Sequence, residues 1–354
     1  MTRLLVTGGA GFIGSRIVAA AIARGWRVQV IDALSPAVHR NAPSLPAGVE
    51  LVQADVTNPR ALDDCLSGVD AVSHQAAKVG MGLDFADAPD YVHANVLGTA
   101  ELLAAMTRAG VSRLVVASSM VVYGEGRYLG SGSEGRARDV RPGARDEADL
   151  RAGMFEPRDP ETRELLRPAL TVEDSPLEPR SVYAVTKLAT EHLTEVWARE
   201  TGGTAALLRY HNVYGPGMPR DTPYAGVAAI FRSALERGEP PRVFEDGGQR
   251  RDFVHVDDIA AANLAAVEWS SSGRGGQARP FNVGSGTVST ILDVARALAR
   301  AHRGPDPVVT GEYRAGDVRH ITASSARAIA ELDWAPSISL ADGIRDFATA
   351  PLRA

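Results

Sequence analysis

Thr7-Gly8-Gly9-Ala10-Gly11-Phe12-Ile13-Gly14, close to the start of the chain, is the stretch that decides the fold. The apolar run Leu4-Leu5-Val6 before it is typical of a parallel strand that is buried on both faces. The Ala-rich segment 15–25 after it has apolar residues at helical spacing and ends in Gly25. A glycine-rich turn between a strand and a helix turns backbone N–H groups and the positive helix N-terminus toward the phosphates of a dinucleotide.

The three spaced glycines have different expected tasks. Gly8 permits the tight turn, Gly11 lets the backbone approach a pyrophosphate, and Gly14 lets the helix lie close to the strand. A second apolar run ends at Asp32, about 20 residues further on, where a carboxylate accepts the adenosine ribose hydroxyls. That carboxylate would repel a ribose phosphate, and the following Ala33-Leu34 offer no arginine, so NAD is favoured over NADP. The complete strand–turn–helix–strand–Asp pattern disfavours the alternative, a merely structural turn in another α/β protein.

Composition excludes several classes of function. The 354 residues suggest about two domains, and a net charge of −5 gives no basic footprint for nucleic acid. The single Cys65 excludes a disulfide framework and a cysteine zinc site, and it fits a reducing compartment. Neither a signal peptide nor an apolar run of about 18 residues is recognisable, so we expect a cytoplasmic protein without a membrane partner.

Strand-like and helical segments alternate through the first half of the chain. Strands are expected at 49–55, 69–77, 111–119 and 205–212, with helices near 59–67, 91–110 and 182–201. This alternation predicts an α/β fold with a doubly wound, Rossmann-like parallel sheet. Ligands in such sheets bind beyond the carboxyl ends of the strands, where this chain carries Asp55, Ala76-Ala77, Ser118-Ser119 and Asn212.

We expect two domains. Residues 1–212 should bind NAD, and residues 213–354 should form a smaller α/β lobe for the substrate, with 246–268 packing back on the first domain. Residues 125–179, rich in Gly, Pro and Arg, form a long insertion that follows Ser119 and should therefore border the active site; a surface insertion without a role is the alternative. A helix at 259–268 should have Asp257 or Asp258 as its N-cap.

Tyr183 and Lys187 lie four residues apart and therefore on one face of a helix. Such a pair is common by chance, but together with Ser119 at a strand end and the dinucleotide turn it indicates a catalytic role. To act as a base near neutrality, Tyr183 needs its pKa lowered by roughly 3 units from about 10. A unit charge about 4 Å away, at an effective dielectric of about 20, supplies that shift, so Lys187 is expected to lower the pKa. Ser119 should hydrogen-bond to the reacting hydroxyl and stabilise the oxyanion.

The motifs together resemble the extended short-chain dehydrogenase/reductase family, in its NAD-dependent nucleotide-sugar epimerase/dehydratase branch, which includes the UDP-galactose 4-epimerases. Further motifs in family order are His74-Gln75-Ala76-Ala77, Asn95-Val96-Leu97-Gly98-Thr99, and the segments 118–124, 209–216, 251–256, 281–284 and 314–317. Within the branch, 76–82 and 122–128 resemble the dTDP-L-rhamnose 4-epimerase type.

The resemblance implies roles for individual residues. NAD would be held by Gly8, Gly11, Phe12, Ile13, Gly14, Asp32, Asp55, Val56, Ala76, Ala77, Asn95, Ser118, Tyr183, Lys187, Tyr210 and Val213. Ser119, Tyr183 and Lys187 would be catalytic. The substrate would be bound by Val79, Met120, Asn212, Arg251 and Arg314. Relatives often carry cysteine pairs in the insertion; this chain has none there, so no metal is expected. A homodimer through the helices at 91–110 and 182–201 is also implied.

The residues after Ser119 bear on the reaction. Dehydratases of the branch carry an acidic pair there, but this chain has Met120 and Val121, which cannot transfer protons. The implied function is 4-epimerisation of a dTDP- or UDP-(deoxy)hexose, by transient oxidation at C4, rotation of the 4-keto sugar and return of the hydride. One alternative is an NAD(P)H-dependent 4-ketoreductase, which Asp32 disfavours. The other is a non-catalytic NAD-sensing protein, which the complete Ser119, Tyr183 and Lys187 set disfavours.

Overall fold

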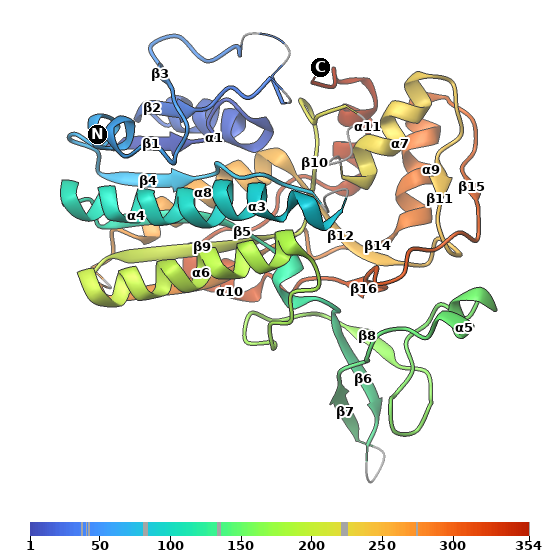
Figure 1. Ribbon diagram of the computed structural model, residues 1–354. Coiled ribbons are helices and arrows are strands. Elements are labelled where there is room, and N and C mark those ends of the chain that lie inside the picture. Colours follow the sequence, from blue (N-terminus) through green and yellow to red (C-terminus); the bar gives the residue numbers. More distant parts are fainter. Residues whose placement is uncertain are drawn as a thin grey trace.

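A seven-stranded parallel sheet forms the centre of the computed structural model, which describes residues 1–36, 38, 39, 41, 43–80, 84–132, 136–220, 226–273 and 275–353. The strand order is β13-β9-β5-β4-β1-β2-β3 (Figure 1). The strands are β1 (Arg3–Thr7), β2 (Arg27–Asp32), β3 (Glu50–Gln53), β4 (Ala71–His74), β5 (Arg113–Ser119), β9 (Thr204–Tyr210) and β13 (Gln277–Val283). The predicted doubly wound α/β fold is confirmed.

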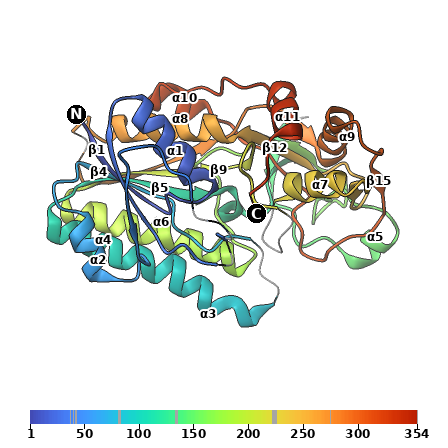
Figure 2. The ribbon, with the colours of Figure 1, turned by 90° about the horizontal axis from the view of Figure 1, so that it is seen from above.

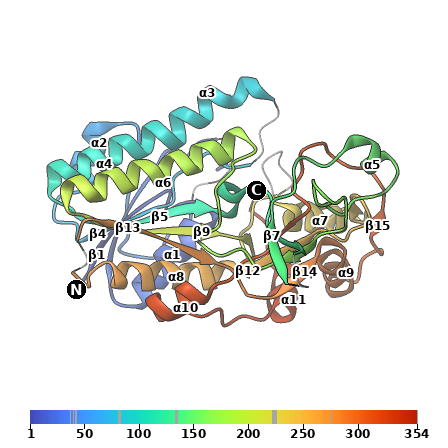
Figure 3. The ribbon, with the colours of Figure 1, turned by 90° about the horizontal axis from the view of Figure 1, so that it is seen from below.

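Helices cover both faces of this sheet (Figures 2 and 3). One face carries α1 (Phe12–Ala23), α8 (Val256–Trp269) and α10 (Ala326–Leu332). The other carries α2 (Pro59–Cys65), α4 (Gly98–Ala109) and α6 (Val182–Thr201), beside the short turns η1 (Phe85–Asp87) and α3 (Ala88–Tyr91). Val, Leu, Ile and Ala side chains of the strands fill a separate apolar core under each layer, as expected for strands buried on both faces.

The helix expected at 91–110 is interrupted by a π-helical turn, η2 (Val92–Leu97), before α4. Asn95 lies within this turn, and its side-chain Nδ2 donates to the Lys78 carbonyl and to the Thr186 hydroxyl, both at 3.0 Å. Periodicity cannot reveal such a turn, because the apolar spacing on both sides of it stays helical. π-Turns of this kind often lie at functional sites.

A smaller lobe adjoins the carboxyl ends of the central strands. Its mixed sheet contains β10 (Asn212–Tyr214), β12 (Arg250–His255), β14 (Val288–Thr290) and β16 (His320–Ile321), and β11 (Arg242–Val243) pairs with β15 (Val308–Val309). Helices α7 (Val227–Glu236), α9 (Ile291–His302) and α11 (Leu340–Thr349) pack around an apolar core. The division at residue 212 stays a prediction; the chain returns to the central sheet beyond it, because α8 packs on α1 and β13 pairs with β9.

Helix α8 does not begin where the sequence suggested. Its N-cap is His255, whose Nδ1 accepts from the Asp257 N–H at 3.2 Å, so the expectation of an aspartate N-cap is wrong. The two carboxylates are used elsewhere: Asp257 pairs with Arg16 at 2.6 Å, and Asp258 accepts from the backbone of Ser337 at 3.0 Å. Both still lie in the first turn, where the helix dipole favours negative charge.

The insertion at 125–179 has its own structure and extends below the body in Figure 1. It contains a three-stranded antiparallel sheet of β7 (Ala137–Val140), β6 (Arg127–Ser131) and β8 (Arg167–Ala169), with α5 (Glu147–Arg151) beside it. Glu125 anchors it, since one carboxylate oxygen accepts from the N–H groups of Arg319 and His320 at 2.9 and 3.0 Å. The insertion therefore holds the segment that follows Arg314.

No helix within the described ranges has both the length and the apolar character needed to cross a bilayer.

Candidate active site

The glycine turn has the backbone geometry that a dinucleotide pyrophosphate requires. Gly8 has φ +65, and a Cβ there would lie 2.7 Å from the Ala76 nitrogen. A Cβ on Gly14 would collide with the Gly8 carbonyl, so this side of the helix must stay bare. Gly11 caps α1 without a side-chain hydrogen bond, which leaves the first-turn N–H groups of Phe12 and Ile13 to a ligand.

Asp32 ends β2 and is buried, at the place where the ribose of NAD is expected. Its carboxylate accepts from the Ala10 N–H at 3.0 Å and from the Leu34 N–H at 2.9 Å. The imidazole of His39 lies 3.5 Å from the same carboxylate, and Arg353 lies next to His39 at 3.4 Å. Sequence reasoning missed both residues, since neither has a local spacing that links it to the turn. The glycine turn and Asp32 fit NAD.

Other expected cofactor residues have partners within the protein. The carboxylate of Asp55 accepts from the Thr57 N–H and hydroxyl, both at 2.8 Å. The Ser118 hydroxyl donates to the buried carboxylate of Glu191. Tyr210 bridges Gln75 and Asn263 through its hydroxyl, at 3.1 and 2.7 Å. Two of the expected residues, Ala76 and Ala77, follow the end of β4, and the Asn95 side chain accepts from the N–H of the next residue, Lys78. Val56 is buried against Gly98, and Val213 pairs with Val254. Direct contact of these residues with NAD stays a prediction.

The three expected catalytic residues converge at the end of β5. Ser119 is the last residue of that strand, and its hydroxyl hydrogen-bonds to Tyr183 on α6. Lys187, one helical turn further on, is buried, and its Nζ lies 6.0 Å from the centroid of the Tyr183 ring. Nζ donates to the Ala117 carbonyl at 2.7 Å, which fixes the ammonium beneath the phenol. The trio has the arrangement needed to move a proton on a substrate hydroxyl.

The electrostatics of this trio differ from expectation. Burial raises the pKa of Tyr183 to about 12, and the hydrogen bond from Ser119 opposes this only partly. Burial also lowers the pKa of Lys187 to about 8, although the Glu191 carboxylate acts in the opposite direction. The expectation that Lys187 alone brings the Tyr183 pKa toward neutrality is therefore wrong. The dominant cause is desolvation of the phenolate in this buried site, and the nearby Tyr91 raises the pKa further.

The expected substrate residues lie where the lobe meets the end of the sheet. Asn212 begins β10, and its buried Oδ1 has no hydrogen-bond partner among the described residues. Arg251 donates to the carbonyls of Arg319 and Val318 at 2.9 and 2.6 Å. Burial raises the pKa of Asp317 overall, although the charges of Arg314 and Arg251 both act to lower it. Arg314 lies over the Phe244 ring, 5.1 Å from its centroid. Val79 is 49% exposed, and Met120 packs beside Val122 in η3 (Met120–Tyr123).

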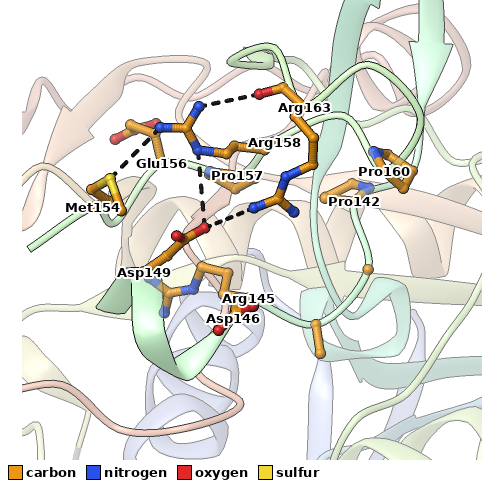
Figure 4. A pocket seen from close by; sticks show the side chains of 12 residues that line it. Pro142, Arg145, Asp146, Asp149, Met154, Glu156, Pro157, Arg158, Pro160 and Arg163 are labelled. Atoms are coloured by element: carbon orange, nitrogen blue, oxygen red, sulfur yellow. Dashed lines mark hydrogen bonds and ion pairs between the residues drawn. The ribbon is translucent and has the colours of Figure 1, made fainter. Parts of the chain in front are cut away.

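A separate pocket of about 100 Å³ lies inside the insertion (Figure 4). Arg163 and Arg158 both approach the carboxylate of Asp149, at 3.2 and 4.0 Å. Arg158 also donates to the Arg163 carbonyl at 3.1 Å. These charges are partnered within the insertion, and none of the expected site residues lines this pocket.

No cluster of three or more His, Cys, Asp or Glu side chains in the described part of the chain is arranged to hold a metal ion.

Comparison with known proteins agrees with this geometry. Residues 4–142 and 161–284 match the model of the NAD dependent epimerase/dehydratase family. The dTDP-L-rhamnose 4-epimerase of Burkholderia thailandensis is 37% identical over 98% of this chain and 94% of its own length.

Among solved structures, a UDP-glucose 4-epimerase of Thermotoga maritima with UDP-glucose has a TM-score of 0.76 and 28% identity, covering 98% of this chain and 97% of that one. A Thermus thermophilus UDP-glucose 4-epimerase in complex with NAD has a TM-score of 0.73 and 30% identity, covering 98% of both chains. These relatives confirm the expected class, an enzyme of the NAD-dependent nucleotide-sugar 4-epimerase type, and NAD as its cofactor. The chain therefore belongs to the NAD dependent epimerase/dehydratase family.

Proposed function

We propose that this chain interconverts the two C4 epimers of a dTDP-activated 6-deoxyhexose. The observation that carries the proposal is the hydrogen-bonded Ser119–Tyr183 pair with the Lys187 ammonium one turn below it. The 37% identity to a dTDP-L-rhamnose 4-epimerase over nearly the whole chain supports this sugar and nucleotide. A UDP-hexose is the competing substrate, because other full-length relatives are UDP-glucose 4-epimerases.

NAD held at the glycine turn and by Asp32 would supply reversible hydride transfer at C4 of the sugar. The remaining chemistry belongs to the chain. Tyr183 takes the proton of the C4 hydroxyl and gives it back, while Ser119 donates a hydrogen bond to the same oxygen. Lys187 carries the positive charge that makes the phenolate accessible.

The substrate's diphosphate would be held by Arg251 and Arg314. Burial lowers the pKa of Arg251, and this guanidinium forms no ion pair with any described carboxylate. Its hydrogen bonds go to backbone carbonyls, so its charge remains available to a phosphate. The unsatisfied Oδ1 of Asn212 is a hydrogen-bond acceptor for a hydroxyl of the bound sugar.

Dehydration is disfavoured by the residues that follow Ser119. Met120 and Val121 occupy the turn η3 and carry no group that transfers a proton. Elimination of water needs such a group, whereas inversion at C4 does not. The alternative 4-ketoreductase would use the same trio but would consume reduced cofactor in each turnover.

The test incubates the purified protein, without added cofactor, with a panel of dTDP- and UDP-sugars and reads the C4 configuration of each product by NMR. We expect inversion of a dTDP-6-deoxyhexose. Tyr183→Phe should lose at least 1,000-fold in rate, a loss of the order that general base catalysis supplies, while still containing NAD. A requirement for added NADPH would instead identify a ketoreductase, and full activity of Tyr183→Phe would remove the catalytic assignment.

We further propose a homodimer formed through η2, α4 and α6. These neighbouring helices carry exposed apolar side chains at Val92, Leu97, Val185 and Val196, which are 40–53% exposed. Light scattering should give twice the mass of the chain, and Val185→Glu with Val196→Glu should give monomers.

We also propose a reducing, cytoplasmic location, consistent with the single buried thiol of Cys65.

A further inference from the structure

The last residues of the chain reach the glycine turn at its beginning. Figures 2 and 3 show the C-terminus beside the carboxyl-end edge of the central sheet. Arg353 donates from Nη2 to the Ala10 carbonyl, inside the turn, and the same nitrogen lies 3.4 Å from His39 Nδ1. Because the Ala10 N–H is itself bonded to Asp32, the guanidinium lies where the turn meets the ribose carboxylate.

The backbone, not the arginine side chain, holds this segment in place. The Arg353 N–H donates to the Met218 carbonyl, and its carbonyl accepts from the Arg220 N–H, both at 3.0 Å. One residue earlier, Leu352 is 6% exposed and belongs to the apolar core of the smaller lobe. Shortening the Arg353 side chain should therefore leave the segment docked.

Among the described residues, the charge of Arg353 has no close counter-ion. Within the described residues it forms no ion pair, and the carboxylate that acts on its pKa is Asp32, through a longer-range attraction. Burial lowers the pKa of this guanidinium, and Asp32 offsets that only in part. A partly buried cation without a paired anion is unfavourable, and a phosphate placed there would supply the missing charge.

We propose that Arg353 is a cofactor-binding residue that clamps the NAD pyrophosphate against the N-terminus of α1 and slows release of the cofactor. The first-turn N–H groups of α1 bind one side of the diphosphate, and the planar guanidinium binds it from the C-terminal segment. Of the phosphates that a dinucleotide can carry, a 2′-phosphate is disfavoured, because the buried carboxylate of Asp32 occupies the ribose position. The inference rests on NAD binding at this turn, as the proposed function requires.

The test compares full-length wild type with Arg353→Ala, Arg353→Lys and the control Arg345→Ala. Arg345 is an arginine of the same C-terminal region, 73% exposed on α11. NAD content is measured after prolonged dialysis and denaturation, and affinity is measured by calorimetry after the stripped protein is refilled. We expect Arg353→Ala to bind NAD about 10- to 100-fold more weakly, as loss of a charge-assisted hydrogen bond predicts, with Arg353→Lys in between and Arg345→Ala unchanged.

Three results would overturn the proposal. One is NAD affinity and retention in Arg353→Ala equal to wild type. The second is an NAD-stripped Arg353→Ala protein that is less heat-stable than NAD-stripped wild type by as much as the NAD-loaded variant is less stable than NAD-loaded wild type, which would make the residue structural. The third is a selective loss of NADP rather than NAD binding, which would assign the guanidinium to a 2′-phosphate. If the wild-type protein itself binds no NAD, the cofactor assignment fails instead, and the two failures are distinguishable.

Discussion

Replacing Lys187 by Met tests how the buried ammonium acts on Tyr183. Methionine retains the apolar stem but removes the charge, which lies 6.0 Å from the phenol ring centroid. The phenolate charge is shared between the oxygen and the ring, and a unit charge about 6 Å from its centre stabilises it by about 3 kcal/mol at an effective dielectric of about 20, or roughly 2 pKa units. With the pKa of Tyr183 already raised to about 12, the variant should be about 100-fold slower at pH 7.

The pH dependence of this ratio is the sharper part of the prediction. Burial lowers the pKa of Lys187 to about 8, so the cation is present below pH 8 and is lost as the pH rises through that value. The wild-type advantage should therefore hold near 100-fold at pH 6 to 7 and shrink about tenfold per pH unit above pH 8. The variant's own rate should keep rising with pH, because only direct deprotonation of the phenol remains.

The assay measures epimerisation rates from pH 6 to 10 with the substrate identified by the panel, at matched NAD content. NAD content and thermal stability of Lys187→Met serve as controls, because the substitution also leaves the Ala117 carbonyl without its donor. A rate ratio that is constant across this range would refute the reasoning, as would an unchanged rate at pH 7. Either result would mean that Lys187 acts by position rather than by charge.

Two further predictions concern stability and cofactor binding. Arg209→Met should lower the free energy of unfolding by about 3–5 kcal/mol in urea titrations, because it leaves the fully buried Glu191 carboxylate without its 2.7 Å partner; a loss no larger than that of an exposed arginine would contradict this. Gly8→Ala should cost about 1–3 kcal/mol of stability and reduce NAD retention, because φ is +65 and the new Cβ would meet the Ala76 nitrogen; normal NAD retention would show that the close approach is not needed.

The parts of the site that sequence predicts are those encoded by local patterns. The glycine spacing and Asp32 follow from one strand–turn–helix–strand unit, and Tyr183 and Lys187 follow from helical periodicity. Ser119 joins them because parallel strands end at a common edge, so a residue at a strand terminus is placed without any tertiary information.

The remaining features depend on contacts between distant segments. Arg353 lies against Ala10 although 343 residues separate them, and no spacing rule connects the two. The pKa of Tyr183 depends on burial, which outweighs the charge that the Tyr–Lys spacing suggests. The insertion's short strands contain Gly and Pro and are held by Glu125 against the 319–320 backbone, so their alternation is too brief to read from the sequence.

The most direct measurement of the central claim uses the substrate labelled with deuterium at C4. If the sugar is oxidised at C4 and the same hydride returns to its other face, the epimerised product retains deuterium at C4. This should occur without added cofactor, and no hydrogen from solvent should enter at C4. NMR and mass spectrometry of the product read this result. Loss of the label to water, or inversion only with added NADPH, would contradict the account.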